Sequence, residues 1–291
     1  MLESREACLE LEQKAEQLRR NAAYNNRRAV IDHEEHLALW DSMSRETRES
    51  ANCLLDVRYG DTPRQKLDIF FPTNESPPLI VFLHGGYWMS MSKDSYSFVA
   101  KNFVREGIAF ACIGFDNCPE ASVKGIVGQT QSAITFLYEN AGALGLDPSR
   151  FYLCGHSSGG HLAAMLLSIR NPERSVPPIQ GALIVSGLFD LEPIRHTYIN
   201  KSLRLTRDSV PAVSPIQLAR ELESIAPHLI LGVGGLELPA YHQQLQSYAA
   251  ALRGIGQSLD VVIANGYHHF DVLYDMAGGA LFEHFKHLIK H

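Results

Sequence analysis

From residue 53 onward, the hydrophobic residues fall into short continuous runs that are bounded by glycine and proline. Between most of these runs lie stretches with the three- and four-residue periodicity of a helix, such as 125–145 and 239–256. Continuous apolar strands that alternate with helices are typical of a mostly parallel sheet whose two faces are both covered. The six expected strands lie within residues 78–86, 108–116, 151–160, 179–190, 228–235 and 259–266.

Two further segments, 53–60 and 65–72, alternate apolar with polar residues and are separated by the turn sequence DTPR. This pattern predicts a β-hairpin at the start of the sheet. The longest connection between strands, residues 191–225, has the length of a segment that often lines a binding site. We therefore expect this insertion to form a wall of any site in the fold.

The first 52 residues differ in character, because no glycine or proline occurs before Gly60. Cys8, Leu11, Ala15 and Leu18 recur at three- and four-residue steps, which places them on one helical face. The pattern predicts an N-terminal helical segment, residues 1–52, packed on a catalytic domain of residues 53–291.

The bulk composition excludes several classes of function. The chain has 291 residues, 45% of them hydrophobic, with a net charge of −6 that offers no basic face to nucleic acid. Five scattered cysteines without a C-x-x-C pair argue against disulfides or a zinc cage. Because the chain has neither a signal-peptide pattern nor an apolar run of the ~20 residues needed to span a bilayer, we expect a cytoplasmic protein without membrane contact.

The histidines do not by themselves predict a metal site, although there are 13 of them. His33 and His36 can share a helix face, but the sequence supplies no third ligand beside them. We expect neither a metal nor another cofactor, and we regard the charged runs of this region as solvated helix faces.

A candidate nucleophile lies in the sequence Gly155-His156-Ser157-Ser158-Gly159, which fits the pattern G-x-S-x-G. An expected strand precedes it and an expected helix follows it, and this context favours a nucleophile elbow over a glycine-rich turn without chemistry. Ser157 would then expose its hydroxyl at the end of the strand. The backbone N–H of Ser158 is suited to binding an oxyanion.

A second glycine-rich stretch, His84-Gly85-Gly86, ends an earlier strand and resembles the HGG loop of esterases. Backbone N–H groups of such a loop face the oxyanion, and glycine permits their close approach. We expect His84 to hold the loop by a hydrogen bond rather than to act as a base. Tyr87 and Trp88 either line an acyl pocket or pack beneath the loop, and the sequence does not decide between these positions.

The acid and the base should follow the nucleophile in that chain order. Glu237 lies at the end of a later strand and is the preferred acid, while Asp190, one strand earlier, is the alternative. The base should come from the loop after the last strand, which contains both His268 and His269. Periodicity does not separate these two adjacent histidines.

Taken together, these stretches resemble the serine-hydrolase arylformamidases (kynurenine formamidases), a branch of the α/β-hydrolase fold near the HGG-type esterases. The resemblance rests on LHGGYWMSMSKDSYSF, CGHSSGGHLAAMLL, VSGLFDLEPI, GGLELPAYHQQ and HHFDV, and the early AYNNRRAV also fits. It covers nearly the whole chain from about residue 21. The combination of HGGYW with GHSxG is considerably more specific than either motif alone.

The resemblance implies a role for each matching position. Ser157 is the nucleophile, and the loop after His84 together with the N–H of Ser158 forms the oxyanion hole. The family's aspartate falls on Glu237, and its base, a histidine directly followed by phenylalanine, falls on His269. The family commonly has aspartate before that histidine, whereas this chain has His268, which removes a negative charge beside the base.

The resemblance also implies the reaction, which is hydrolysis of an N-formyl or small N-acyl arylamine such as N-formylkynurenine through an acyl-enzyme. A carboxylesterase acting on short-acyl or aryl esters would use the same residues and is the alternative. A non-catalytic ligand-binding protein is disfavoured because all three members of a triad are present. The histidine- and aspartate-rich motif of the metal-dependent formamidases is absent.

Two properties of the substrate and the assembly remain open at this point. Arg195, Arg204 and Arg207 are candidates to bind a substrate carboxylate, but exposed arginines of this kind are more often solvated surface charges. A homo-oligomer is compatible with the sequence, which does not specify one.

Overall fold

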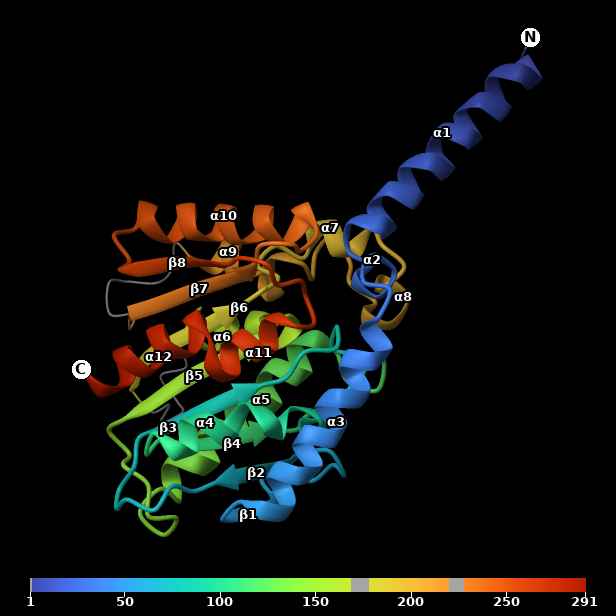
Figure 1. Cartoon of the computed structure of the whole chain (residues 1–291). Coiled ribbons are helices and arrows are strands. Elements are labelled where there is room, and N and C mark those ends of the chain that lie inside the picture. Colours follow the sequence, from blue (N-terminus) through green and yellow to red (C-terminus); the bar gives the residue numbers. More distant parts are fainter. Residues whose placement is uncertain (1, 169–177, 220–227) are drawn as a thin grey trace.

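The computed structural model describes residues 2–168, 178–219 and 228–291, with an eight-stranded sheet at its centre (Figure 1). Each of the six expected apolar runs forms a strand, so the predicted sheet is confirmed. The strands are β1 (Cys53–Arg58), β2 (Lys66–Phe70), β3 (Leu79–Leu83), β4 (Ala109–Ile113), β5 (Phe151–His156), β6 (Ile179–Val185), β7 (His228–Gly234) and β8 (Leu259–Ala264).

The strand order is β1-β2-β4-β3-β5-β6-β7-β8. Strands β1 and β2 pair antiparallel, as the expected hairpin requires, and β2 pairs antiparallel with β4. All the remaining neighbours are parallel. The carboxyl ends of β3 to β8 therefore meet at one edge of the sheet, which is where open α/β sheets place their sites.

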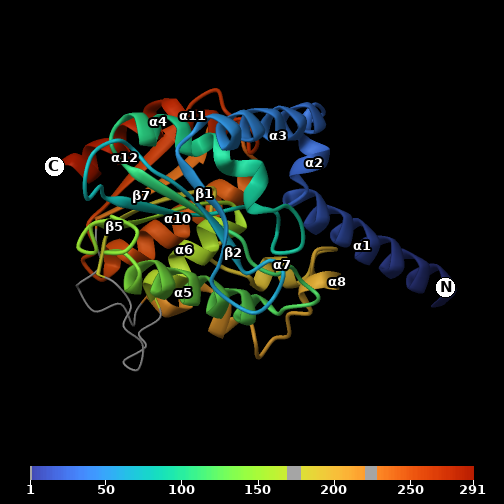
Figure 2. The same ribbon diagram turned by 90° about the horizontal axis from the view of Figure 1, so that it is seen from below.

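Helices cover both faces of the sheet (Figure 2). Helices α4, α11 and α12 pack on one face, and α5, α6 and α10 pack on the other. Their bounds, with those of the shorter helices, are α4 (Ala100–Arg105), α5 (Val123–Glu139), α6 (Ser158–Ser168), α7 (Glu192–Arg195), α8 (Asn200–Leu203), α9 (Pro215–Leu218), α10 (Pro239–Gly254), α11 (Val272–Gly278), α12 (Ala280–Lys290), and the 3₁₀ helices η1 (Lys93–Val99) and η2 (Pro211–Val213).

The central strand β3 shows why its sequence is apolar throughout. Leu79, Val81 and Leu83 belong to the apolar layer beneath α5, α6 and α10, whereas Ile80 and Phe82 belong to the layer beneath α4, α11 and α12. All five side chains are fully buried. The two-residue period of a strand thus supplies two hydrophobic layers from one continuous run.

The N-terminal segment contains α1 (Leu2–Ala23), α2 (Asn26–Ala29) and α3 (His33–Ser50). The helical prediction is confirmed. The contacts of α1 with the rest of the molecule include those of Gln17 and Asn21, which lie in its second half. Figure 1 shows α1 extending away from the rest of the molecule, and Leu11 and Leu18 are 68% and 56% exposed. By contrast, α3 packs against η1 through Trp40, which is buried.

The connection between β6 and β7 contains α7, α8, η2 and α9. Its residues 220–227, which include the end of the expected insertion, lie outside the described residues. The connection contacts the N-terminal segment, since the side chain of Gln17 donates a hydrogen bond to the backbone oxygen of His196 at 2.8 Å. Within the described ranges, no helix has both the length and the apolar character needed to cross a bilayer.

Candidate active site

Ser157 occupies the sharp turn between β5 and α6. Its φ of +58° is left-handed, which is uncommon for a residue other than glycine. A Cβ atom at Gly155 would lie 2.3 Å from the backbone oxygen of Gly159, and one at Gly159 would lie 1.9 Å from that of Leu83. Both glycines are therefore required for strand and helix to approach this closely, and the turn has the form of a nucleophile elbow.

A chain of hydrogen bonds connects Ser157 to a histidine and a carboxylate. The hydroxyl of Ser157 lies 3.0 Å from Nε2 of His269, and Nδ1 of His269 lies 2.6 Å from Oε2 of Glu237. The other carboxylate oxygen of Glu237 accepts hydrogen bonds from the hydroxyl of Ser186 and, at 2.8 Å, from the backbone N–H of Gly234. Because Glu237 accepts at both oxygens, it is oriented to receive the Nδ1–H of the imidazole.

The alternative acid, Asp190, is occupied elsewhere. Its carboxylate accepts the backbone N–H of Glu192 at 2.9 Å, and its own backbone N–H donates to the side chain of Gln244. The side chain of Glu237, in contrast, is fully buried against His269. The geometry thus places Glu237 beside the candidate base.

The structure separates the two adjacent histidines. Nδ1 of His268 lies 3.0 Å from the carboxylate of Asp271, and its ring packs edge-on against His36, with ring centroids 4.9 Å apart. Burial lowers the pKa of His268, and the charge of Asp271 opposes this effect. His268 therefore contacts the N-terminal segment, whereas His269 faces Ser157.

The same contact changes the expectation for the histidines of α3. His36 lies near Asp32 and His268 and not in a cluster with His33. One nitrogen or oxygen atom from each of Asp32, His36 and His268 lies within 4.8 Å of the other two. His33 instead contacts the backbone oxygen of Val30 through Nδ1.

His84 orients the oxyanion loop. Its Nδ1 lies 2.7 Å from the backbone oxygen of Gly85, and its ring stacks on Phe115 with the centroids 4.2 Å apart. Since the oxygen of Gly85 and the N–H of Gly86 belong to one peptide plane and point in opposite directions, this hydrogen bond fixes the direction of the Gly86 N–H. Burial lowers the pKa of His84 to about 4, so the ring remains neutral and is suited to the role of a donor rather than a base.

Glycine is necessary at position 86. Its φ is +119°, and a Cβ atom there would lie 2.2 Å from the backbone oxygen of Ser90. Ser158, on the other side of Ser157, is the first residue of α6, where a backbone N–H has no partner within the helix. A Cβ at Gly85 would lie only 3.2 Å from that of Ser157, so the two donor segments flank the hydroxyl closely.

The two aromatic residues after the loop take different positions. Tyr87 lines the cavity over Ser157, and its hydroxyl donates to the backbone oxygen of Tyr24 at 2.6 Å. Trp88 is buried and donates its indole N–H to Nδ1 of His161 at 3.2 Å. Of the two alternatives left by the sequence, Tyr87 forms a wall and Trp88 packs beneath the loop.

Above Ser157 lies a cavity of about 250 Å³ with a largely aromatic and apolar lining. Its walls come from the N-terminal segment, the oxyanion loop with the following η1, the turn at Ser157, the loop after β8 that carries His269 (the base loop), and the α7–α8 connection. They are formed by Asn26, Arg27, Leu37, Trp40, Gly86, Tyr87, Met89, Ser90, Met91, Tyr96, His156, Ser157, Tyr198, His269 and Phe270. Of the part of the expected insertion that the structure describes, residues 191–219, Tyr198 lines the cavity.

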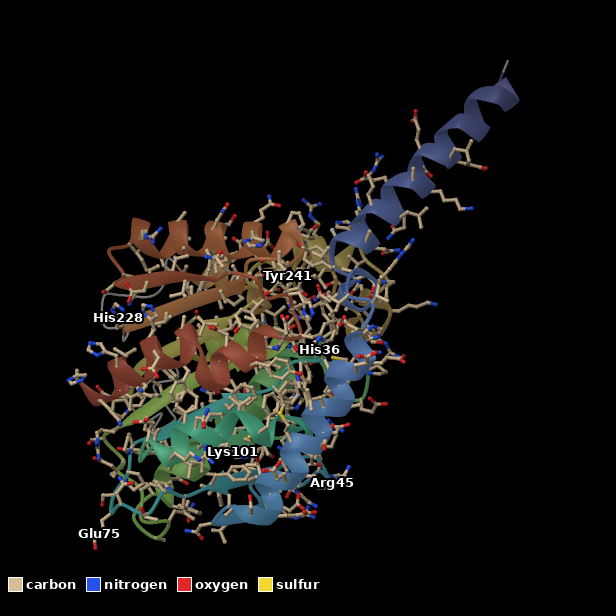
Figure 3. All side chains as sticks on the ribbon, viewed as in Figure 1. His36, Arg45, Glu75, Lys101, His228 and Tyr241 are labelled. Atoms are coloured by element: carbon tan, nitrogen blue, oxygen red, sulfur yellow. The ribbon has the colours of Figure 1, made fainter. Side chains whose placement is uncertain are left out.

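The contribution of the N-terminal segment to this cavity was not predicted. Asn26 is buried and its amide donates to the hydroxyl of Tyr241 at 2.8 Å, while that hydroxyl lies 2.5 Å from the hydroxyl of Tyr87. Tyr241, which is labelled in Figure 3, belongs to the first turn of α10. Its ring centroid lies 4.6 Å from that of His269.

The comparisons with known proteins agree with this geometry. The family model BD-FAE matches residues 67–187. A kynurenine formamidase from Danio rerio is 32% identical over 243 residues, which cover 82% of this chain and 82% of that protein. The chain belongs to the kynurenine formamidase family. The resemblance drawn from the motifs is thereby confirmed.

Other proteins that this chain resembles include esterases. An isoprenylcysteine alpha-carbonyl methylesterase from Arabidopsis thaliana is 26% identical over 258 residues, covering 80% of this chain and 60% of that protein. A crystal structure from Silicibacter sp. TM1040, of a protein provisionally assigned as a thioesterase, superposes with a TM-score of 0.81 at 30% identity, covering 93% of this chain and 98% of that one. The protein is a serine hydrolase with the α/β-hydrolase fold.

Proposed function

We propose that the protein hydrolyses an N-formyl or small N-acyl arylamine, with Ser157 as nucleophile, His269 as base and Glu237 as the acid that orients it. The observation that carries the proposal is the hydrogen-bonded chain from Ser157 through His269 to Glu237 at the floor of a small aromatic cavity. Membership in the kynurenine formamidase family supports the choice of substrate class.

In the first half of the reaction, Nε2 of His269 takes the proton of Ser157 while the serine oxygen attacks the acyl carbon. The backbone N–H groups of Gly86 and Ser158 stabilise the oxyanion of the tetrahedral intermediate, and one such donor typically contributes ~3 kcal/mol to the lowering of the barrier. His269 then gives its proton to the departing arylamine nitrogen, and the C–N bond breaks.

In the second half, a water molecule takes the place of the amine. His269 removes a proton from this water, the resulting hydroxide attacks the acyl-serine, and His269 returns the proton to the serine oxygen. A formyl group leaves as formate. Glu237 accepts the Nδ1–H of His269 throughout and stabilises the imidazolium that forms in each half.

The walls of the cavity support an aryl substrate. Trp40, Tyr96 and Phe270 supply ring surfaces over the candidate nucleophile, and aromatic side chains bind planar rings by offset or edge-on contacts. The volume of about 250 Å³ suits a small acyl group and one ring.

A second candidate function is hydrolysis of short-acyl or aryl esters. The specific observation in its favour is the relationship to the Arabidopsis methylesterase, since the same triad attacks an ester more easily than an amide. The two activities differ in the leaving group, which is an alcohol or phenol in one and an arylamine in the other.

The test is a comparison of kcat/KM on N-formylkynurenine, formanilide and phenyl acetate. The proposal predicts efficient cleavage of at least one formamide, and turnover of the ester alone would overturn it in favour of the second candidate. A fluorophosphonate probe should label the wild type and not Ser157→Ala; equal labelling of both would exclude Ser157 as the nucleophile. Because no step uses a metal, EDTA should leave the activity unchanged.

The proposed organisation follows from the cavity walls. Residues 53–291 form the catalytic domain, and residues 1–52 form a segment whose second half, from Asn26 to Trp40, completes the substrate cavity. The partner of this site is a small molecule.

A further inference from the structure

Arg27 differs from every other residue around the cavity over Ser157. Of the lining residues in the described ranges, Arg27 is the one with a permanent positive charge, and none is a carboxylate. The walls beside it are aromatic, with Tyr96 and Tyr198 nearby. Burial raises the pKa of both tyrosines, and the charge of Arg27 opposes this rise at both.

The guanidinium of Arg27 is available to a ligand. Arg195 forms an ion pair with Glu192 at 2.5 Å, and Arg150 forms one with Asp147 at 2.6 Å. Within the part of the chain that the structure describes, Arg27 has no carboxylate within 4.0 Å. An arginine that lines an apolar cavity and has no carboxylate partner can form two parallel hydrogen bonds with an incoming carboxylate.

The backbone that carries Arg27 is fixed by its neighbours. Asn25 accepts the backbone N–H of Arg28 at 3.1 Å and so begins α2. The buried Asn26 is tied to Tyr241 at 2.8 Å. Since the residue on each side is held by a hydrogen bond, Arg27 projects from an anchored turn rather than from a free loop.

The charge of the chain and the positions of its other candidate arginines favour Arg27 as the group that binds a carboxylate. The overall charge of the chain is −6, so long-range attraction does not favour an anionic molecule and a local cation is needed to hold one. The arginines that the sequence offered for this role lie elsewhere, with Arg195 paired to Glu192 and with Arg204 and Arg207 exposed outside the cavity lining.

We propose that Arg27 binds a carboxylate carried by the arylamine part of the substrate, while the acyl group lies at Ser157. This inference rests on the proposed function and narrows it to N-acyl arylamines whose ring substituent carries a carboxylate. Arg27 then acts as a specificity-determining residue, and the N-terminal segment supplies both a wall of the cavity and its selectivity.

The kinetic test compares N-formylkynurenine, an amino acid that carries a carboxylate and an ammonium group, with formanilide, which carries neither. Arg27→Ala should lower the ratio of kcat/KM values, N-formylkynurenine over formanilide, at least tenfold, chiefly through KM for N-formylkynurenine. Arg27→Lys should restore part of the ratio, because an ammonium keeps the charge without the bidentate geometry. Arg28→Ala is the matched control, since Arg28 is adjacent and outside the cavity lining, and it should leave the ratio unchanged. An unchanged ratio in Arg27→Ala would overturn the inference.

A binding measurement keeps this test separate from the proposed reaction. Kynurenine, an arylamine with an amino-acid carboxylate, should bind to Ser157→Ala and lose at least tenfold in affinity in Ser157→Ala/Arg27→Ala, as measured by calorimetry. This result would support the carboxylate site even if the wild type cleaved only esters. Equal affinity of the two variants, or no binding to either, would contradict the site whatever the reaction proves to be.

Discussion

The imidazole of His156 donates its Nε2–H to the backbone oxygen of His269 at 3.0 Å. The residue directly before the candidate nucleophile therefore holds the loop that carries the candidate base, and the two rings lie 4.7 Å apart. Burial lowers the pKa of His156 well below its usual value, and the proximity of His269 adds to this effect. His156 thus remains neutral, and its charge does not oppose the imidazolium that forms on His269.

This relationship predicts that His156 is a positioning residue. His156→Ala removes the donor to the base loop and should lower kcat about tenfold or more with little change in KM, because a small displacement of a catalytic group is costly. His156→Gln retains an N–H donor and should recover part of the loss. Steady-state kinetics of both variants provide the measurement. Loss of folding in both, or an unchanged kcat in His156→Ala, would contradict the positioning role.

The two adjacent histidines should differ sharply in their effect on turnover. His269→Ala removes the group 3.0 Å from Ser157 and should lower kcat by at least about 1,000-fold. His268→Ala removes a contact with His36 and should stay within about tenfold of the wild type, since this ring does not face Ser157. Single-turnover kinetics with excess enzyme measure both, and the opposite ranking would transfer the role of base to His268.

Replacing each candidate acid by its amide distinguishes the role of Glu237 from that of Asp190. Glu237→Gln keeps the shape of the side chain but places an N–H₂ group or a neutral oxygen against Nδ1 of His269, and we expect kcat to fall by about 10³- to 10⁴-fold. Asp190→Asn still offers an oxygen to the backbone N–H of Glu192, so its kcat should change less than about threefold. Thermal unfolding of both variants is the control for folding. A larger loss in Asp190→Asn would reverse the assignment.

The oxyanion loop should be intolerant of a single methyl group. Gly86→Ala places a Cβ 2.2 Å from the backbone oxygen of Ser90 at a φ of +119°, so the loop must shift and its N–H with it. We expect a loss of about 100-fold in kcat, which corresponds to one misplaced donor. Gly128→Ala in α5 is the matched control, because nothing lies within 4 Å of its added Cβ, and its activity should equal that of the wild type. Similar kinetics for both variants would exclude the loop from the oxyanion hole.

Much of the fold could be predicted because each of its strands leaves a strong local pattern. β3, for example, is apolar at every position, and its burial on both faces explains why. The turn at Ser157 could be predicted for a related reason, since its two glycines are imposed by contacts at 2.3 Å and 1.9 Å that any Cβ would violate. Local steric demands of this kind are readable in one sequence.

The features that the sequence did not predict depend on contacts between distant segments of the chain. The side chain of Asn26 meets Tyr241 across 215 positions, and no periodicity records such a pair. The exposure of Leu18 to solvent could not be predicted either, because the spacing of apolar residues on α1 indicates a helical face but not what covers that face. His268 and His269 differ only in which way each side chain points, and this depends on the contact of His268 with α3.

The buried histidines predict how stability depends on pH. Burial lowers the pKa of His84 and His161 to about 4, against about 6.5 in an unfolded chain. As the pH falls from about 6.5 to 4, the unfolded state takes up protons that the folded state does not, so stability decreases; above about 6.5 these groups contribute no pH dependence. Each histidine should therefore lower the free energy of unfolding by about 2 kcal/mol when the pH falls from 7 to 5.

Urea unfolding at these two pH values measures the effect, and His161→Gln isolates one histidine. The ring of His161 accepts from Trp88 and contacts the backbone oxygen of Val213 at 2.8 Å, and a glutamine amide can make both contacts without titrating. The variant should lose less stability than the wild type on going from pH 7 to pH 5, by about 2 kcal/mol. Every carboxylate is common to the two proteins, so identical losses would show that His161 keeps the same proton affinity in the folded and unfolded states.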